Sequence, residues 1–260
     1  MLTKRLIACF DIINSMVTKA VQFQDNINVA PAAKLAETMY DAQIDELIFY
    51  DITASSEKRR IDIETVKSVA RCIFIPFTVG GGIKDLNDMY EALKAGAEKI
   101  SIDSMAVRNP KIISDGAKAF GSQCIVLSTQ VKRAKQMSSG YEVYIDGARL
   151  ATGMDAIEWI KRGQELGAGE ICLNSIDNDG TLSGYDLELM KLAGTSVSVP
   201  LIASGGAGVP AHLKALFTDT EAQAAIISSM LYSPRMERNY TVRELKEYLM
   251  QNKISVRPSK

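Results

Sequence analysis

Two glycine-rich segments of this sequence have the composition of phosphate-binding turns. They read VGGGIKDL and ASGGAGVP, and each follows a short apolar run and precedes a segment with helical spacing. Because glycine has no Cβ, backbone N–H groups can approach an anion closely there. A serine follows the next apolar run in each case, and its hydroxyl is a further phosphate ligand. The residues of these two candidate sites are Gly81, Gly82, Gly205, Gly206, Ser104, Ser228 and Ser229.

The alternative interpretation is that these glycines only make tight turns between a strand and a helix. A single motif does not separate the two interpretations. Two matching motifs at corresponding places, each followed by a serine at the end of an apolar run, favour phosphate binding. Two phosphate sites at one active face suit a substrate that carries a phosphate at each end.

Asp11 is the candidate for proton transfer. It ends the apolar run RLIACFD, and a carboxylate at the end of a buried strand is suited to general acid–base catalysis. An aspartate that only caps a loop is the alternative. The stretch IVLSTQVKR has the same character, but Gln130 stands where a carboxylate would be expected. Glutamine keeps hydrogen-bonding groups but does not exchange a proton near neutral pH.

The elements that must position these residues are eight apolar runs separated by amphipathic segments. The runs are RLIACFD, ELIFYD, IPFTVG, KISID, CIVLST, EICLNS, VPLIASG and AAIISS. Such alternation predicts a parallel sheet with crossover helices, and eight units in 260 residues match a closed (β/α)8 TIM barrel, one α/β domain over residues 1–260. In such barrels the chemistry lies at the carboxyl ends of the strands. Tyr141 and Tyr144 alternate as in an outer hairpin, which is either a lid or plain surface structure.

The first half of the chain recurs in the second half. DELIFYDITAS resembles GEICLNSIDND, IPFTVGGGI resembles VPLIASGGA, and ISIDSM resembles AIISSM. Gly81 pairs with Gly205, 124 positions later. The repeat predicts a barrel built from two duplicated half-barrels. It also aligns Asp11 with Gln130, which makes the glutamine the counterpart of the candidate catalytic aspartate.

Composition argues against several classes of function. A net charge of −1 gives no electrostatic footprint for nucleic acid or membrane, and no apolar run reaches the length of a membrane span. The four cysteines lack CxxC spacing and no signal peptide precedes them, so free thiols and a cytoplasmic location are expected. The single histidine, His212, has no Cys or His nearby in the sequence, so no metal site is expected.

Taken together, these segments resemble the cyclase subunit of imidazole glycerol phosphate synthase, the HisF family. The resemblance covers nearly the whole chain and is carried by KRLIACFD, DELIFYDITAS, IPFTVGGGI, GAEKISID, GAGEICLNSIDNDGTLSGYDLE, VPLIASGGAG and VRELKEYL. It implies a heterodimer with a glutaminase subunit, which docks on the amino-terminal face and releases ammonia into the barrel. The ammonia reacts with a bis-phosphate substrate, the ribulosyl form of an aminoimidazole-carboxamide ribonucleotide. The implied products are imidazole glycerol phosphate and AICAR, in histidine biosynthesis, and no cofactor is implied.

The resemblance also implies roles for individual residues. Asp11 matches the family's catalytic aspartate, and Lys19 matches its substrate-binding lysine. Positions around the substrate are matched by Asp51, Gly82, Asp177, Asp179, Gly180, Gly206 and Ser229. A charged ring that gates ammonia at the amino-terminal mouth is matched by Arg5, Glu46, Lys99 and Glu170. Glu98, beside Lys99, is the candidate contact to the partner.

Three features depart from the family pattern at the reaction face. Gln130 replaces the second catalytic aspartate. The first loop usually contains two glycines, but residues 14–20 read NSMVTKA and contain none. Asp103 replaces an asparagine at a phosphate position, where a carboxylate repels a phosphate dianion or binds a sugar hydroxyl instead.

The sequence supports three hypotheses about function. The first is the histidine-pathway synthase subunit, with its efficiency lowered by Gln130. The second is a paralogue that keeps the partner and the ammonia route but serves amidation of a surface-polysaccharide sugar. The third is a non-catalytic scaffold that activates a glutaminase. Turnover of the ribulosyl substrate with ammonia separates the first hypothesis from the other two.

Overall fold

The computed structural model describes residues 2–21, 24–54, 57, 59–234 and 236–259. Within this part of the chain, eight parallel strands close into a barrel in the order β1, β4, β5, β6, β7, β10, β11 and β12, with β12 back beside β1. They are β1 (Arg5–Ile13), β4 (Glu46–Asp51), β5 (Phe77–Gly80), β6 (Lys99–Ile102), β7 (Ile125–Arg133), β10 (Glu170–Ser175), β11 (Leu201–Ser204) and β12 (Ala224–Ile226). Each apolar run of the sequence overlaps one of these strands, which confirms the predicted (β/α)8 fold.

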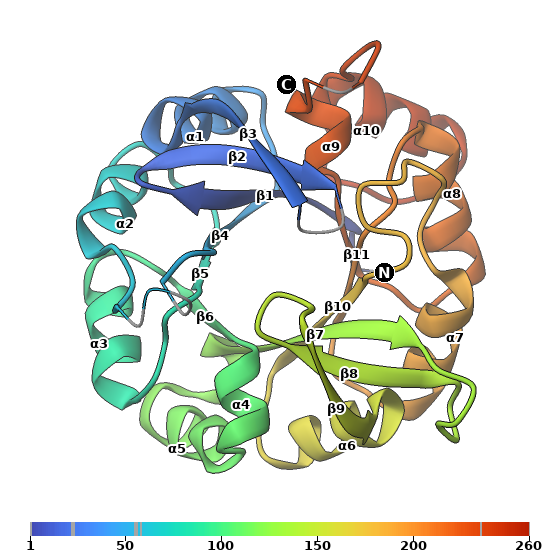
Figure 1. The fold of residues 1–260 in the computed structure, drawn as a ribbon. Helices are drawn as coiled ribbons and strands as arrows, with labels where there is room; N and C mark the ends of the chain where they lie inside the picture. Colours follow the sequence, from blue (N-terminus) through green and yellow to red (C-terminus); the bar gives the residue numbers. More distant parts are fainter. Residues whose placement is uncertain (1, 22–23, 55–56, 58, 235, 260) are drawn as a thin grey trace.

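Helices surround the barrel (Figure 1). They are α1 (Ala32–Asp41), α2 (Ile63–Ala70), α3 (Leu86–Lys94), α4 (Ser104–Arg108), α5 (Lys111–Phe120), the 3-10 helix η1 (Ser122–Cys124), α6 (Ala156–Glu165), α7 (Leu187–Ser196), α8 (Pro210–Asp219), α9 (Ser228–Tyr232) and α10 (Val242–Gln251). Side chains cap several of their amino ends. The Asp85 carboxylate accepts the N–H of Asp88 in α3, and Thr241 and Glu244 form a capping box on α10. None of the described helices combines the length and apolar character needed to cross a bilayer.

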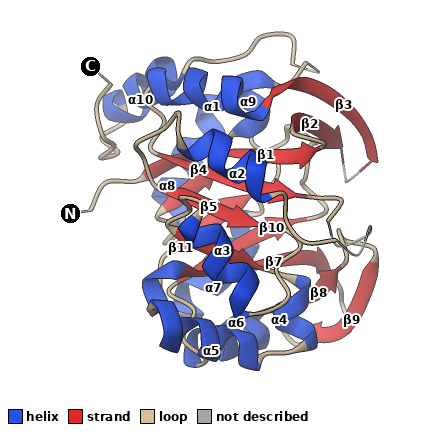
Figure 2. Cartoon of the chain, turned by 90° about the vertical axis from the view of Figure 1, so that its left-hand side faces the viewer, coloured by secondary structure: helices blue, strands red, loops and turns tan. Residues whose placement is uncertain are grey.

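A β-hairpin follows the first strand of each half-barrel. Strand β2 (Met16–Val21) pairs antiparallel with the end of β1, and β3 (Gln24–Pro31) pairs with β2. In the same way, β8 (Tyr141–Ile145) pairs with the end of β7, and β9 (Leu150–Asp155) pairs with β8. Both hairpins project from the carboxyl-terminal side of the barrel (Figure 2). Their equivalent positions agree with the predicted duplication and with the hairpin expected around Tyr141.

Residues 14–20, which the resemblance assigns to the first loop, belong to the first of these hairpins. Asn14 and Ser15 form its turn with φ angles of 48° and 62°. This left-handed conformation costs a residue with a Cβ about 1–2 kcal/mol. The Ser15 hydroxyl lies 2.6 Å from that of Thr65 on α2, and its carbonyl accepts the N–H of Ala32 at 3.0 Å. These bonds hold the turn in place without the two glycines of the family pattern.

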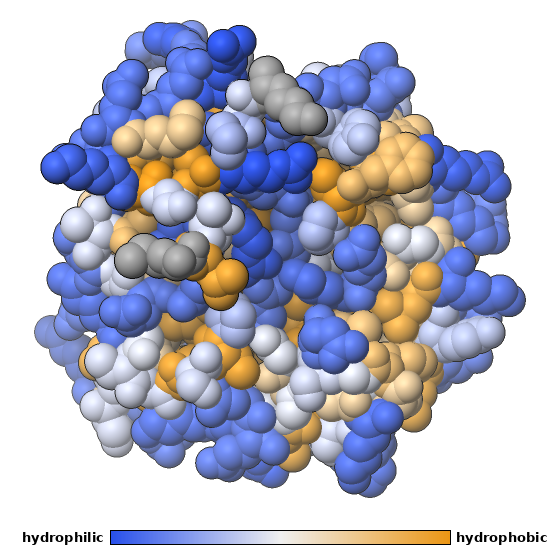
Figure 3. Space-filling view, turned by 180° about the vertical axis from the view of Figure 1, so that it is seen from behind, coloured by the Kyte–Doolittle hydropathy of each residue, from blue (hydrophilic) through white to orange (hydrophobic). Residues whose placement is uncertain are grey.

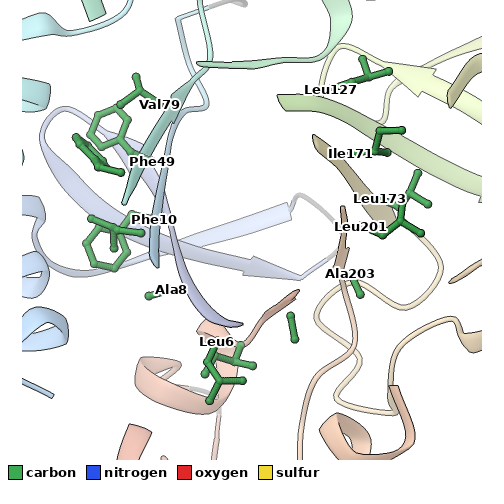
Figure 4. Close-up of a cluster of buried hydrophobic side chains, with 14 of the residues drawn as sticks. Leu6, Ala8, Phe10, Phe49, Val79, Leu127, Ile171, Leu173, Leu201 and Ala203 are labelled. Atoms are coloured by element: carbon green, nitrogen blue, oxygen red, sulfur yellow. The ribbon is translucent and has the colours of Figure 1, made fainter. Parts of the chain in front are cut away.

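The core has an inner and an outer layer. Inside the barrel lie Ile7, Cys9, Ile48, Val126, Cys172, Ile202, Ala224 and Ile226. The outer layer fills the space between strands and helices, and Figure 4 shows Phe10, Phe49 and Leu127 on that side of their strands. Because both faces of each strand are covered, the apolar runs are nearly continuous in the sequence.

A buried ion pair joins α10 to the amino-terminal side of the barrel. The Lys246 side chain is 0% exposed, and its Nζ lies 2.6 Å from Asp45 Oδ1 and 2.7 Å from the carbonyl oxygen of Gln43. The other oxygen of Asp45 accepts the N–H of Leu6 on β1 at 2.9 Å. The pair therefore connects the last helix to the first strand of the barrel.

Replacing Lys246 by methionine should lower the free energy of unfolding by about 3–5 kcal/mol, because it leaves the Asp45 carboxylate buried without its cation. Urea unfolding followed by circular dichroism measures this. The double variant Lys246→Met with Asp45→Asn carries no unpaired charge and should recover at least half of the loss. Equal stability of Lys246→Met and the unaltered chain would contradict the assigned role of the pair.

Candidate active site

A cavity of about 770 Å³ opens at the carboxyl-terminal face of the barrel. Most of the residues that the sequence places around a substrate line it. They are Asp11, Lys19, Asp51, Gly81, Gly82, Asp103, Ser104, Gln130, Asp179, Gly180, Gly205, Gly206, Ser228 and Ser229. Asp177 is not among the lining residues. Its carboxylate accepts the N–H of Arg133 at 2.9 Å and so supports the outer part of β7.

Asp11 and Lys19 form an ion pair at the cavity wall, with Lys19 Nζ 3.4 Å from Asp11 Oδ2. Lys19 comes from β2, so the first hairpin supplies the cation for the carboxylate on β1. Although burial opposes the charge of Lys19, the Asp11 carboxylate raises the pKa of its ammonium group. Burial also raises the pKa of the nearby Asp179 to about 6, with Lys19 acting in the opposite direction and Asp11 in the same direction. The group therefore combines a cation with two carboxyl groups, and the pKa of one of them, Asp179, is raised.

Gln130 and Asp103 are hydrogen-bonded to each other. Gln130 Nε2 donates to Asp103 Oδ2 at 3.2 Å, and Gln130 Oε1 accepts from Asn174 Nδ2 at 2.8 Å. The three side chains come from β7, from the end of β6 and from β10, which are neighbours in the barrel. Two of the three departures from the family pattern are therefore in direct contact.

The surroundings of Asp103 favour its protonated form. Withdrawal from solvent raises the pKa of its carboxyl to about 7, against the opposing effect of the Gln130 hydrogen bond. The carboxylate of Asp146 acts in the same direction as burial, and the guanidinium of Arg108 acts against it. Arg108 is itself paired with Asp146, at 2.6 Å. Near neutral pH this carboxyl is therefore able both to hold and to release a proton.

The two glycine-rich turns have the same geometry in both halves. Gly81 has a φ of +85°, and a Cβ added to it would lie 2.2 Å from the carbonyl oxygen of Asp51. Gly205 has a φ of +92°, and a Cβ there would lie 2.8 Å from the carbonyl oxygen of Ser175. Asp51 and Ser175 are also 124 positions apart. The repeat therefore includes the carbonyl groups that leave no room for a side chain at Gly81 and Gly205. Each turn therefore requires glycine for its conformation and for its space.

The serines at the strand ends differ in their freedom to bind a ligand. The buried Ser228 hydroxyl donates to the carbonyl of Cys9 at 2.8 Å and accepts its N–H at 2.7 Å, so it joins the start of α9 to β1. The Ser104 hydroxyl accepts the N–H of Asp146 at 2.9 Å, which connects it to the second hairpin. Ser229 is half-buried and lines the cavity.

Asp51 organises the loop that follows β4. Its two oxygens receive both Nη groups of Arg59, at 2.5 and 2.7 Å, and also the N–H groups of Ala54 and Asp62. A bidentate pair of this kind fixes both side chains. Because the backbone of Asp51 lies against Gly81, this network also supports the first glycine turn.

The opposite end of the barrel is closed by a ring of four charged side chains. Arg5 donates to Glu46 at 2.5 Å and also to Glu170. Lys99 donates to the same two carboxylates at 2.8 and 2.9 Å. Each cation thus bridges both anions, and the four charges compensate one another. Glu98, next to Lys99 in the sequence, is exposed.

Comparison with known proteins agrees with this arrangement. A family model described as "Histidine biosynthesis protein" matches residues 5–237. Two proteins named imidazole glycerol phosphate synthase subunit HisF, from Desulfosudis oleivorans and Desulfatibacillum aliphaticivorans, are each 50% identical over 260 residues, which is 99% of this chain and 99% and 98% of theirs. Another with the same name, from Prochlorococcus marinus, is 45% identical over 258 residues, 99% of each chain. The chain belongs to the histidine biosynthesis protein family, as a HisF member.

Several cavity residues of this HisF chain were not found by the sequence reasoning. They are Tyr50, Lys84, Arg108, Arg149 and Asn174. Arg108 is on α4 and Arg149 is in the turn of the second hairpin, so only the fold brings these cations to the Ser104 end of the cavity. For Tyr50 and Asn174 the signal was available, because both belong to apolar runs that end at the carboxyl face.

The remaining reactive side chains of this HisF chain have structural surroundings. Nδ1 of His212 accepts the N–H of Gly208 at 3.2 Å at the start of α8. The cysteines are free, two of them buried and two half-buried. Among the described residues, no group of His, Cys, Asp and Glu is arranged to hold a metal ion.

Replacing Gly206 by alanine should disrupt the glycine turn of the second half, which is a candidate phosphate site. Its φ is +96°, and the new Cβ would lie 2.0 Å from the carbonyl oxygen of Gly184. Gly153→Ala is the matched control, because its φ is +73° and nothing lies within 4 Å of the added Cβ. Both variants should lose about 1–2 kcal/mol of stability from the left-handed conformation.

The two variants should differ in ligand response. Inorganic phosphate that binds the folded state raises its stability, and thermal unfolding with increasing phosphate measures this rise. The rise should persist in Gly153→Ala and be absent in Gly206→Ala. An equal rise in both variants would show that the Gly206 turn does not bind phosphate.

Proposed function

We propose that this chain is the cyclase subunit of imidazole glycerol phosphate synthase and acts in histidine biosynthesis in the cytoplasm. It combines ammonia with the ribulosyl carboxamide ribonucleotide to give imidazole glycerol phosphate and AICAR. The observation that carries this proposal is the pair of equivalent glycine turns on one cavity that also contains Asp11 and Lys19. Full-length identity to HisF proteins supports the same reaction.

In this proposal some cavity residues bind the substrate and others transfer protons. The turns at Gly81 and Gly205 receive the two phosphates of the substrate through backbone N–H groups. Cations at the cavity wall neutralise part of their charge. Asp11, held beside Lys19, exchanges protons with the reacting centre. The orientation of a substrate by both of its ends is itself a large contribution to rate, because the reacting carbon is then fixed relative to Asp11.

Ammonia is proposed to enter through the charged ring and to travel inside the barrel. Above the ring, the Thr78 hydroxyl lies 3.3 Å from Glu46, and the Tyr50 hydroxyl lies 3.0 Å from that of Ser101 and 3.5 Å from that of Ser128. These hydroxyls stand among the apolar side chains of the inner layer. Such a lining offers hydrogen bonds to a small neutral molecule without offering it a charge.

The partner is proposed to be a glutaminase subunit that forms a heterodimer on the amino-terminal face. Figure 3 shows this face, with hydrophilic residues over its middle and hydrophobic patches beside them. Phe74, three residues before β5, is 83% exposed and forms an edge-type aromatic pair with Tyr40, with ring centroids 6.0 Å apart. An exposed aromatic residue of this kind is typical of a docking surface.

The two other hypotheses are not favoured. Neither a paralogue for sugar amidation nor a non-catalytic scaffold is indicated by the names of the full-length relatives, which are synthase subunits. A scaffold would also have no use for a cavity with two phosphate turns and an Asp11–Lys19 pair.

The test is turnover of the ribulosyl carboxamide ribonucleotide by the purified chain with ammonium salts, with product formation followed by absorbance. The unaltered chain should form both products. Asp11→Asn should lower the rate by a factor of about 100 to 10,000, the usual contribution of a general acid or base. Absence of turnover in the unaltered chain, even at high ammonia, would reject the proposed function.

If ammonia passes through the ring, a change in the ring should affect turnover with glutamine more than turnover with ammonium salts. In Lys99→Met the two glutamates share only Arg5, so the closed ring opens and carries net negative charge. With the glutaminase partner, glutamine-dependent turnover should fall about tenfold or more, a change of about 1.4 kcal/mol. Turnover with ammonium salts should change little, because that ammonia also enters from the cavity. Lys118→Met, on the exposed face of α5, is the control. A parallel fall in both activities would contradict a role for the ring in ammonia transfer.

A further inference from the structure

The internal repeat leaves one proton-transfer position without a carboxyl group. Asp11 on β1 aligns with Gln130 on β7, and glutamine does not exchange protons near neutral pH. The structure places another carboxyl group at this position in space. Asp103 Oδ2 lies 3.2 Å from Gln130 Nε2, and both side chains line the cavity.

We propose that Asp103 is the second proton-transfer group of this enzyme, in the place that the repeat assigns to residue 130. It acts on the substrate from the β6 side of the cavity, while Asp11 acts from β1. The proposal rests on the proposed function, since it concerns the same substrate. Asp103 is thus a catalytic residue, and Gln130 is the positioning residue that holds it.

The amide groups beside Asp103 fix its orientation. Asn174 donates to Gln130 Oε1, so the Gln130 amide turns its N–H group towards Asp103 Oδ2. Within the described part of the chain, the other oxygen, Oδ1, takes part in no hydrogen bond. One oxygen is therefore held by the protein, and the other remains available to a substrate in the cavity.

The two carboxyl groups have different partners. Asp11 has Lys19 as a counter-ion at 3.4 Å, whereas no described cation lies within ion-pair distance of Asp103. The charged and titratable groups that face Asp103 are Arg108 on α4, Asp146 after β8 and Cys172 on β10. Burial leads these effects and brings its pKa to about 7. The two carboxyl groups therefore lie in different electrostatic surroundings, because only Asp11 is paired with a described cation.

The proposed step is the addition of ammonia to the ribulosyl ketone. The nitrogen lone pair forms a bond to the carbonyl carbon, and the carbonyl π electrons move to oxygen, which takes the proton of Asp103. The positively charged nitrogen of the adduct then returns a proton to the Asp103 carboxylate. Ammonia and the ketone thus give a carbinolamine, and the carboxyl group is regenerated.

Exchange of the two side chains tests the assignment. Asp103→Asn keeps the size and the hydrogen-bonding capacity of the side chain, but it should lower kcat/KM with ammonia by a factor of about 100 to 10,000. The double variant Asp103→Asn with Gln130→Asp returns a carboxyl group to the same place and should recover most of this loss. Asp115→Asn, on the outer helix α5, is the matched control and should have the rate of the unaltered chain. Thermal unfolding verifies that each variant is folded.

The pH profile distinguishes catalysis from a structural role. At a fixed concentration of unprotonated ammonia, kcat/KM should fall as pH rises through about 7, because the donor form of Asp103 is lost above its pKa. This fall should be absent in Asp103→Asn and return in the double variant. A fall that persists in Asp103→Asn would assign the donor role to another group, such as Asp179, and would overturn the proposal.

The outcomes separate this proposal from the function on which it rests. An unaltered chain without turnover would reject the synthase function and the proposal together. An active chain whose Asp103→Asn variant keeps the full rate would reject only the role of Asp103. An active chain with a slow, folded Asp103→Asn variant and an active double variant would establish it.

Discussion

The backbone hydrogen bonds that close the barrel, at β1–β12 and at β7–β10, determine where the chemistry of this protein lies. Because the eight barrel strands are parallel, closure brings all their carboxyl ends to one rim and all their amino ends to the other. One rim receives the cavity, and the other receives the ring of Arg5, Glu46, Lys99 and Glu170. The barrel interior between them is the shortest path from one to the other. Closure of the barrel therefore separates the proposed site of ammonia entry from the proposed substrate cavity and also connects them through the barrel interior.

Duplication of the half-barrel explains what is symmetric in the cavity, and divergence explains what is not. The glycine turns keep the same close approach to a carbonyl oxygen in both halves, as for Gly81 and Gly205. The proposed proton-transfer groups have diverged. Asp11 forms an ion pair with Lys19 of the hairpin that follows it, whereas Gln130 forms a hydrogen bond to Asp103 at the end of the preceding strand. A substrate with a phosphate at each end but a single reacting carbon requires this combination of equal binding sites and unequal catalytic groups.

Local patterns in the sequence predicted the barrel, because a short apolar run indicates each strand and a glycine-rich composition indicates each turn. The contact between Asp103 and Gln130 could not be predicted in this way. The residues are 27 positions apart, and each one alone looks like the loss of a functional group. Only the pairing of β6 with β7 brings them together. The same limit applies to Arg149, which lines the cavity because it lies in the turn of the second hairpin. It applies also to residues 14–20, where a hairpin turn forms without the glycines that would have indicated it.

The proton on Asp103 resolves the conflict that its charge would create with a phosphate. A carboxylate repels a phosphate dianion, whereas a neutral carboxyl group does not, and a bound dianion raises the pKa of a nearby carboxyl further. Substrate binding would therefore strengthen the donor form of Asp103. At the other rim the two cations and two carboxylates compensate one another, which suits the proposed passage of ammonia as a neutral molecule. In this proposal ammonia reaches the carbonyl group with its lone pair free, and the protonated form of Asp103 supplies the proton that the carbonyl oxygen requires.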